Sequence, residues 1–483
     1  MSQVLGVIVI ARNGDRTNLY QDPTSYAPSL AETTALGEVQ SFHLGQLLRA
    51  TYYDPASPSY IAGIRGDLVD NNEVHVRVKA GTAGTVVFDS AIALLQGLYP
   101  PTAKNRIVLA NGTTVVAPLG GYQYVPVETV EPGNDRSMEG WTACPNFQKH
   151  VEAFHASDAF KRKEKEAAPF FSAVRDFVFG RPTTLANAWN IYDYVSTEYT
   201  HNRTYAFRLP PRLDEQARAL ADWHEAAVFA DAAPNGIGNV AGRTLLHTVL
   251  RAVERIAFDH DPLQFLLVET SYQPLVSFFN LTGMAGQHGA LRAIPDYASA
   301  LAVELRRGAP PDVRDFLRFR FTNGSAGFRD VRPYGHGADI PLTEFVYRAE
   351  NAAITNNKEW MQVCGAKSLG GHGGEWTVGP NVTDGASGAA DRPTLGFSDR
   401  PTALGFSDRP TLDAATTAGC GLDLAPLLAG IALAAAAALL ARALGRRRRA
   451  VRLEGAEGAR WEAREGEYRD AKEVRGEVPV SRA

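Results

Sequence analysis

Cysteine is scarce in this chain: Cys144, Cys364 and Cys420 are the only three among 483 residues. An odd count excludes complete pairing of the cysteines within one chain. One intramolecular disulfide is plausible, and the sequence leaves open which two cysteines would form it.

An excess of positive charge is also missing. The 49 lysines and arginines face 53 aspartates and glutamates, and no basic patch dominates the first 365 residues. This balance argues against a nucleic-acid partner. The Gly-His-Gly-Gly stretch at residues 371–374 is too isolated to form a metal site. We therefore expect no nucleic-acid partner, no metal and no cofactor.

Charge is absent from residues 424–441, an 18-residue run that is followed by Arg442 and by four arginines at 446–449. At 1.5 Å per residue the run spans about 27 Å, close to the hydrocarbon thickness of a bilayer. The alternative is an alanine-rich soluble helix. We favour one transmembrane helix over residues 424–444, with the charged tail at 445–483 in the cytosol and the large domain extracellular or lumenal.

Five N-glycosylation sequons support that orientation. They begin at Asn111, Asn202, Asn280, Asn323 and Asn381, and none follows residue 385. A signal peptide does not precede the first strand, so we expect the written N-terminus to be incomplete. The alternative is a cytosolic domain with a C-terminal anchor, which would leave the arginine cluster on the wrong side of the membrane.

A repeat separates the large domain from the apolar run. Asp391, Asp399 and Asp408 each begin a nearly identical Asp-Arg-Pro-Thr segment. Proline at each repeat and the lack of hydrophobic periodicity predict a low-complexity stalk over residues 366–422.

Residues 1–365 predict one α/β domain with an inserted helical cap at about 144–259. Apolar runs of strand length and residues at helical spacing mark its elements. Predicted strands are Val4–Ala11, His75–Lys79, Ile107–Ala110, Gln123–Glu128, Phe265–Glu269, Ala298–Arg306 and Phe316–Phe321; predicted cap helices are Ala167–Val178, Leu185–Tyr199, Leu213–Asp231 and Val240–Phe258.

The end of the first strand carries the clearest functional signal. Its apolar run stops at Arg12, and Asn13, Gly14, Asp15 and Arg16 follow. A buried strand of an α/β sheet would deliver both guanidinium groups to the sheet edge where such folds bind ligands. Two guanidinium forks at one strand end suit a phosphate group. The alternative is a structural network of salt bridges.

This stretch resembles the Arg-His-Gly-x-Arg signature of the histidine acid phosphatases, in the histidine phosphatase superfamily. Residues 36–40 and 44–49 are similar to the helix that follows that signature in the family, and the resemblance extends from about Val4 to about Gly365. It implies a phosphoglycerate mutase-like fold, with helices on both faces of the core sheet. It also implies a third phosphate-binding arginine at the end of the next strand, which Arg77 matches.

The catalytic residues of the family are poorly matched. Asn13 occupies the position of the nucleophilic histidine, and Tyr272 and Gln273 stand where a His-Asp pair would supply the general acid. The pair at residues 260–261 precedes the strand instead of following it, so we interpret it as a solvated loop. Glu269 is the one carboxylate close enough in sequence to act as a tentative proton donor.

Asn13 decides which function follows. A family enzyme forms a phosphohistidine, and an amide nitrogen cannot replace the imidazole because its lone pair is delocalised. We therefore expect a membrane-anchored acid phosphatase-like protein that binds phosphomonoesters through Arg12, Arg16 and Arg77 and is catalytically impaired. The alternatives are a non-enzymatic phosphate-ester binding or scaffolding module, and an active phosphatase if the asparagine is a sequence error.

Overall fold

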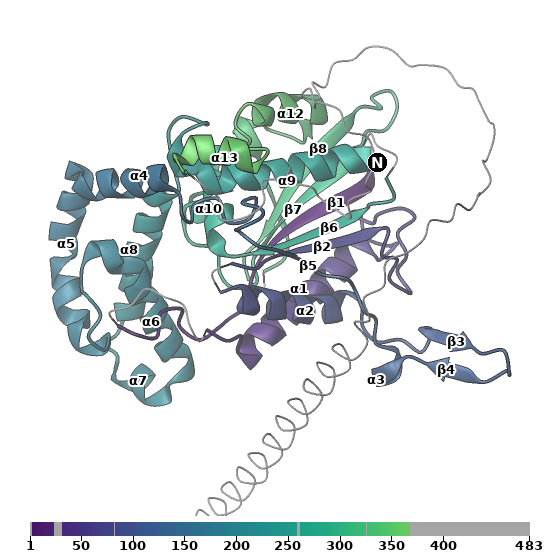
Figure 1. Cartoon of the computed structure of the whole chain (residues 1–483), viewed down its shortest axis with the longest axis horizontal. Coiled ribbons are helices and arrows are strands. Elements are labelled where there is room, and N and C mark those ends of the chain that lie inside the picture. Colours follow the sequence, from purple (N-terminus) through teal and green to yellow (C-terminus); the bar gives the residue numbers. More distant parts are fainter. Residues whose placement is uncertain (1, 24–30, 82, 258–260, 325, 368–483) are drawn as a thin grey trace, which may run out of the picture. The chain divides into compact units, whose positions relative to one another are not determined.

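The computed structural model describes residues 2–23, 31–81, 83–257, 261–324 and 326–367 (Figure 1). By its internal contacts the chain divides into two units, Met1–Ala386 and Ser387–Ala483. The predicted transmembrane helix, the tail and all but the first two residues of the stalk lie outside the described residues. Within the described ranges, no helix combines the length and apolar character needed to cross a bilayer.

A mixed β-sheet forms the centre of the first unit. Its strand order is β10-β8-β7-β1-β6-β2-β5, with β9 paired to β8. The parallel strands are β1 (Gln3–Arg12), β6 (Phe265–Thr270), β2 (Val74–Lys79) and β5 (Glu128–Val130), and the antiparallel side contains β7 (Ala300–Arg307), β8 (Asp315–Thr322), β9 (Arg329–Val331) and β10 (Ile340–Pro341). The carboxyl ends of β1, β6 and β2 therefore meet at one edge, where α/β sheets bind ligands.

Helices cover both faces of this sheet, as predicted (Figure 1). Val7 and Val9 of β1 pack toward α1 (Ala35–Tyr52) and α2 (Gly84–Leu98). Ile8 and Ile10 pack on the other face, toward α9 (Val240–Ala257), α10 (Tyr272–Leu281) and α12 (Leu342–Glu350). Because both faces are buried, β1 is a continuous apolar run instead of an alternating one.

The inserted helices form an apolar cluster of their own. They are α4 (Pro145–Ala156), α5 (Asp158–Val174), α6 (Ala188–His201), α7 (Arg203–Arg208) and α8 (Leu213–Val228). Phe160, Phe171 and Ile191 are buried among them. Leu246 and Val249 of α9, which falls within the predicted cap, pack in the core on the same face of the sheet as Ile8 and Ile10.

Two predicted strands differ from the structure. The segment predicted at Ile107–Ala110 is β3 (Arg106–Val108), which pairs with β4 (Thr114–Val116) in a separate, exposed hairpin. The segment predicted at Gln123–Glu128 enters the sheet only at its last residue, as β5. The short helices α3 (Pro118–Gly121) and α11 (Met284–Gln287) and the C-terminal α13 (Asn357–Cys364) complete the elements.

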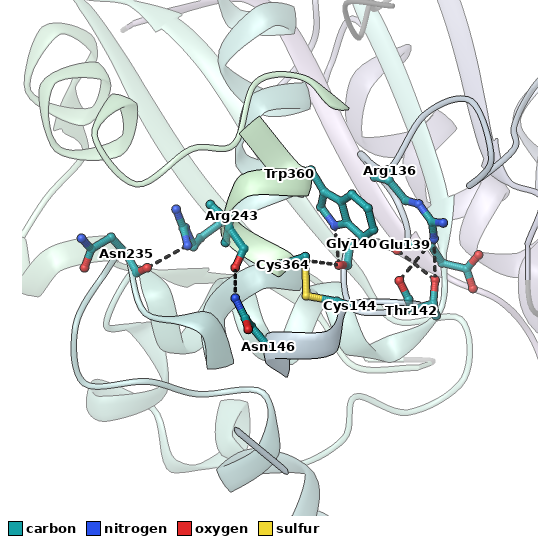
Figure 2. Close-up of a disulfide and its surroundings, with 11 residues drawn as sticks. Arg136, Glu139, Gly140, Thr142, Cys144, Asn146, Asn235, Arg243, Trp360 and Cys364 are labelled. Carbon is teal, nitrogen blue, oxygen red and sulfur yellow. Dashed lines mark hydrogen bonds between the residues drawn. A yellow bond between two sulfur atoms is a disulfide. The ribbon is translucent and has the colours of Figure 1, made fainter. Parts of the chain in front are cut away.

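A disulfide between Cys144 and Cys364 ties the start of α4 to the end of α13 (Figure 2). It joins residues 220 positions apart in the sequence. Next to it, the indole of Trp360 donates a hydrogen bond of 2.7 Å to the Gly140 carbonyl, and the Arg136 guanidinium lies 4.6 Å from the indole centroid. The disulfide therefore fixes the beginning of the cap to the core.

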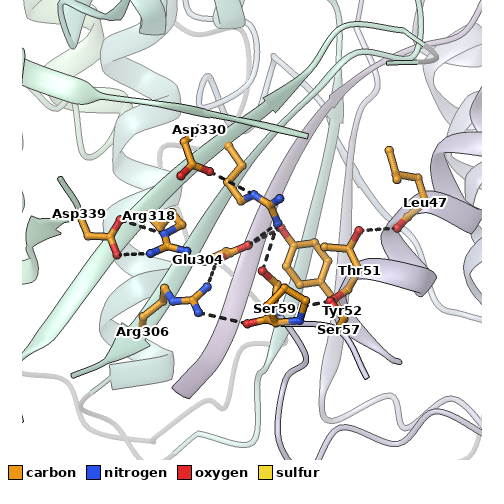
Figure 3. Close-up of polar contacts among 12 residues, drawn as sticks. Leu47, Thr51, Tyr52, Ser57, Ser59, Glu304, Arg306, Arg318, Asp330 and Asp339 are labelled. Carbon is orange, nitrogen blue, oxygen red and sulfur yellow. Dashed lines mark hydrogen bonds and ion pairs between the residues drawn. The ribbon is translucent and has the colours of Figure 1, made fainter. Parts of the chain in front are cut away.

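A buried ion cluster fastens the end of α1 to the antiparallel strands (Figure 3). The Glu304 carboxylate of β7 is fully buried, and it accepts hydrogen bonds from the Tyr52 hydroxyl at 3.1 Å and from Arg320 at 3.3 Å. Arg306 pairs with the same carboxylate. Arg320 also pairs with Asp330 at 3.5 Å. Two carboxylates therefore balance two guanidinium groups, and we interpret this cluster as structural.

Removing the disulfide should destabilise the whole first unit. Closing a loop of 220 residues restricts the unfolded chain by about 5 kcal/mol in the chain-entropy estimate. We expect Cys144→Ser with Cys364→Ser to lower the free energy of unfolding by several kcal/mol in urea denaturation. Cys420→Ser is the matched control and should leave it unchanged. Equal stability of the double variant and the native chain would contradict the linkage.

Candidate functional site

A cavity of about 280 Å³ lies where β1, β2 and β6 end. Three cationic side chains line it: Arg12, Arg16 and Lys79. The two carboxylates on its wall are Glu139 and Glu225. Aromatic side chains form much of the remaining surface, namely those of Tyr20, Trp141, Trp189, Phe229 and Tyr272.

Arg12 is buried at this edge without a carboxylate partner. Only 5% of the residue is exposed, and it forms no ion pair within the described part of the chain. Its guanidinium lies 4.1 Å from the ring centroid of Tyr297 and donates to the Pro295 carbonyl, while its Nε has no hydrogen-bond partner. Burial lowers the pKa of Arg12. A bound anion would supply the charge that this site lacks.

Arg16 has a fixed partner in the cap. Its guanidinium forms a two-pronged ion pair with Asp193 of α6, with N–O distances of 2.7 and 3.2 Å. The same carboxylate accepts a 2.7 Å hydrogen bond from the Leu19 amide. Burial alone would lower the pKa of Arg16, but Asp193 raises it above the ordinary value. The pair therefore holds Arg16 charged and oriented on the cavity wall.

Arg77 is not on that wall, which corrects the predicted arginine trio. Its guanidinium forms ion pairs with Glu128 at 3.1 Å and Asp135 at 2.9 Å. Lys79 takes the cavity position because it is the last residue of β2, and it pairs with Glu139 at 3.1 Å. Arg77 lies two residues earlier in the strand, so its side chain remains farther back from the edge.

Asn13 lines the cavity on a loop that is fixed on both sides. Its amide donates to the Thr270 carbonyl and its carbonyl accepts from the Ala298 amide, each at 3.1 Å. Its side-chain nitrogen donates to the Gly14 carbonyl at 2.8 Å. A Cβ atom on Gly14 would lie 2.2 Å from the Gly37 carbonyl oxygen. Glycine is therefore required for the loop to pack against the start of α1.

The N-terminus of α10 contributes unpaired polar groups. Ser271, Tyr272 and Gln273 line the cavity, and the buried Ser271 Oγ and Gln273 Oε1 have no hydrogen-bond partner. No side chain caps this helix. A helix N-terminus presents free N–H groups and a partial positive charge, which favours an anion.

The Asp261 carboxylate lies in the segment before β6 and pairs with Arg255 at 2.8 Å. Asp261 is not among the residues that line the cavity.

Glu269 does not line the cavity, so the structure does not support it as the proton donor. It follows the alternation of Phe265 and Leu267, whose side chains pack on the α1 and α2 face. The residue is fully buried and neither carboxylate oxygen has a hydrogen-bond partner. Burial raises the pKa of Glu269 to about 8. It is thus a neutral carboxylic acid at neutral pH.

Several cavity residues were not predicted from the sequence. Trp189 comes from α6 and Glu225 from α8, and only Lys79 had a local signal, its place at a strand end. Asp193 of α6, the partner of Arg16, was also not predicted. Glu225 accepts a 2.7 Å hydrogen bond from the Tyr272 hydroxyl. Helical periodicity marks cap residues as inward-facing, but it does not say which inward residues meet the sheet edge.

Comparison with known proteins identifies similar chains. A family described as the histidine phosphatase superfamily, branch 2, matches residues 6–313. A lysosomal acid phosphatase from Bos taurus is 23% identical over 365 residues, covering 74% of this chain and 79% of its own length. The human lysosomal acid phosphatase is 27% identical over 217 residues, covering 44% of this chain and 45% of its own length.

Two solved structures share the fold. A phytase from Citrobacter braakii superposes with a TM-score of 0.51 at 10% identity, covering 74% of this chain and 99% of the phytase. The apo form of a Hafnia alvei phytase gives 0.50 at 12% identity, covering 75% and 98%. At this identity the similarity shows the fold alone.

Burial of Glu269 should make stability depend on pH. Its pKa is raised from 4.5 to about 8, so its contribution is fully present below pH 4.5 and is lost as the pH rises toward 8. Between pH 5 and pH 8 the native protein should lose a few kcal/mol of its free energy of unfolding, and Glu269→Gln should not show this loss. Urea denaturation of both proteins at the two pH values measures this difference. A stability difference between them that does not change with pH would contradict it.

Proposed function

The chain belongs to the histidine phosphatase superfamily, branch 2, and we propose that its cavity binds phosphomonoesters through Arg12 and Arg16. We further propose that hydrolysis is impaired, because Asn13 stands where the family has its nucleophilic histidine. The observation that carries the first part is the buried Arg12 guanidinium, which faces the cavity without a carboxylate partner.

The charge distribution supports one phosphate group as the ligand. Arg16 and Lys79 are each balanced by a carboxylate, so Arg12 and the N-terminus of α10 supply the uncompensated positive charge, and Arg16 would donate hydrogen bonds beside them. A charge-assisted hydrogen bond to a guanidinium is among the strongest available to a phosphate oxygen. Glu139 and Glu225 would repel further phosphates on the same ligand.

The aromatic wall supports an organic ester. Trp189 stacks on Tyr272 with ring centroids 5.9 Å apart, and Tyr20 meets Trp189 edge-on at 5.8 Å. These rings offer apolar surface beside the cationic end of the cavity. A phosphomonoester has the same polarity, with an anionic group at one end and an organic group at the other. Pockets that combine apolar walls with a few polar groups bind small molecules in this way.

Asn13 supports the loss of covalent catalysis. The Asn13 side-chain nitrogen already donates a hydrogen bond to the Gly14 carbonyl, and its lone pair is delocalised into the amide. Histidine is absent from the lining residues within the described part of the chain. The cavity would therefore bind the ester without forming a phosphoenzyme, as a binding or scaffolding module would.

The membrane-anchored, lumenal location remains part of this proposal. The disulfide is typical of proteins that fold in an oxidising compartment. Asn111 and Asn202 are exposed, whereas the amide nitrogen of Asn323 donates to Asp296 at 2.6 Å and is poorly placed for modification.

Two treatments test the location. We expect the protein to stay in membranes after a carbonate wash and to become smaller after glycosidase treatment, with Asn111→Gln reducing that shift. A chain truncated after Asp413 is the control for anchoring and should be released. Release of the full-length chain together with no glycosidase shift would contradict the proposed location.

Arg12→Ala should abolish ligand-induced stabilisation. Phosphate at 100 times its dissociation constant stabilises a one-site protein by about 2.7 kcal/mol, and we expect the native chain to show this as a rise in melting temperature. Arg77→Ala is the matched control, since Arg77 is also buried but is not on the cavity wall. It should lower the starting melting temperature and keep the phosphate-induced rise. An unchanged rise in the Arg12 variant would refute the site.

Asn13→His should restore hydrolysis. Removing one member of a catalytic unit can cost on the order of 10⁶-fold in rate, and we expect the variant to exceed the native chain by at least about 10²-fold on p-nitrophenyl phosphate. That leaving group needs little protonation, so the gain should be smaller on an alkyl phosphate. Asn13→Ala is the control and should remain at the native rate. Rapid turnover by the native chain would contradict the proposed impairment.

A further inference from the structure

A chain of hydrogen bonds leads from the cavity into the cap. The Tyr272 hydroxyl donates to Glu225 Oε2 at 2.7 Å, and Glu225 Oε1 lies 2.9 Å from His224 Nδ1. The Nε2 atoms of His224 and His155 are 2.9 Å apart. Tyr272 begins α10, Glu225 and His224 belong to α8, and His155 is in the last turn of α4.

Burial changes along this chain from its inner to its outer end. Tyr272, Glu225 and His224 are buried, with 4%, 6% and 6% of their surface exposed, while His155 is partly exposed. Glu225 lines the cavity. The chain therefore connects a carboxylate on the cavity wall with a histidine that solvent can reach.

One assignment of hydrogens satisfies every contact. With Glu225 ionised and both imidazoles neutral, His155 donates from Nε2 to His224 Nε2, and His224 donates from Nδ1 to Glu225. Tyr272 donates to the other carboxylate oxygen, and because burial and Glu225 raise its pKa well above the ordinary value, it keeps its proton. In this arrangement one added proton can move from ring to ring toward Glu225.

The positive and negative charges at the cavity are equal in number before an anion binds. Arg12, Arg16 and Lys79 supply three positive charges, and Glu139, Glu225 and the Asp193 partner of Arg16 supply three negative ones. A dianion would therefore enter a site of zero net charge. Glu225 is the carboxylate of this set that has no arginine or lysine partner among the described residues.

We propose that anion binding in the cavity is coupled to uptake of one proton by Glu225, delivered through His224 and His155. The proton enters on His155 Nδ1, His155 passes the hydrogen on Nε2 to His224 Nε2, and His224 passes the hydrogen on Nδ1 to Glu225 Oε1. Both rings end neutral with their tautomers exchanged, and Glu225 ends as a carboxylic acid. This inference rests on the proposed anion site.

The titratable groups around Glu225 come from several elements. On α8 itself, Asp222 lies about one turn and Arg218 about two turns earlier; they pair with each other at 3.1 Å, and Arg218 also pairs with Asp296 at 3.0 Å. Six further titratable groups lie around the hydrogen-bonded path. They are Arg12 from β1, Arg16 from the loop after β1, Lys79 from β2, Glu139 from the segment before α4, Asp193 from α6, and Tyr20. Burial and His224 lower the pKa of His155, which favours the neutral ring.

Sulfate is the appropriate probe because it remains a dianion from pH 5.5 to pH 8 and carries no proton of its own. We expect titration calorimetry of the full-length protein, in two buffers of different ionisation enthalpy, to show uptake of up to one proton per sulfate. The dissociation constant should rise by up to about tenfold per pH unit over the range where uptake occurs.

Glu225→Gln should bind sulfate with a dissociation constant that changes little with pH and without proton uptake. Glu139→Gln is the matched control, because it also removes a cavity carboxylate but is not part of the hydrogen-bonded path. It should tighten sulfate binding and keep the proton uptake. His155→Asn interrupts the path at its outer end, so it should slow the proton uptake, followed with a pH indicator after rapid mixing, without changing its extent. Tyr272→Phe removes a hydrogen bond to the ionised Glu225 carboxylate, so it should move the uptake to higher pH and tests the coupling if Glu225→Gln fails to fold. Equal proton uptake by the native chain and Glu225→Gln would overturn the coupling alone. Absence of sulfate binding at every pH would overturn the anion site and the coupling together.

Discussion

The burial of Arg12 at the carboxyl end of β1 is the constraint on which the site depends. Its guanidinium is held by an aromatic face and a backbone carbonyl instead of a carboxylate. Such an arrangement is costly unless a counter-charge arrives. The parallel strands place it there, the glycine after Asn13 lets the loop pack on α1, and the rings of Tyr272 and Tyr297 lie against it.

The cap and the core contribute different parts of the cavity. The core supplies the cations and the N-terminus of α10, and the cap supplies Glu225 and Trp189 together with Asp193, the partner of Arg16. The disulfide between Cys144 and Cys364 fixes the entrance of the cap to the core. In the proposed function, binding is separate from the nucleophile, because Asn13 would remove the covalent step and leave Arg12, Arg16 and the N-terminus of α10 in place.

The sequence predicted the sheet, the helices on both faces and the strand end at which the cavity lies, because a buried strand that ends in two arginines has a strong local pattern. It did not predict the cavity wall. Arg77 was predicted to bind phosphate, but Lys79 is the residue of β2 that lines the cavity. The two side chains lie on the same face of the strand, and Lys79 is two residues closer to its end. Glu269 was taken for a proton donor because sequence proximity does not reveal the face on which a side chain lies. Glu225 has no motif, and its role depends on how α8 packs against α10.

A crystal structure of the protein with tungstate bound would test the central claim most directly. Tungstate is a tetrahedral dianion whose scattering makes its position unambiguous. We expect tungstate within hydrogen-bonding distance of the Arg12 guanidinium, beside Arg16 and the N-terminus of α10. Tungstate bound elsewhere, or a carboxylate closing on Arg12 in its place, would contradict the claim that this cavity is an anion site.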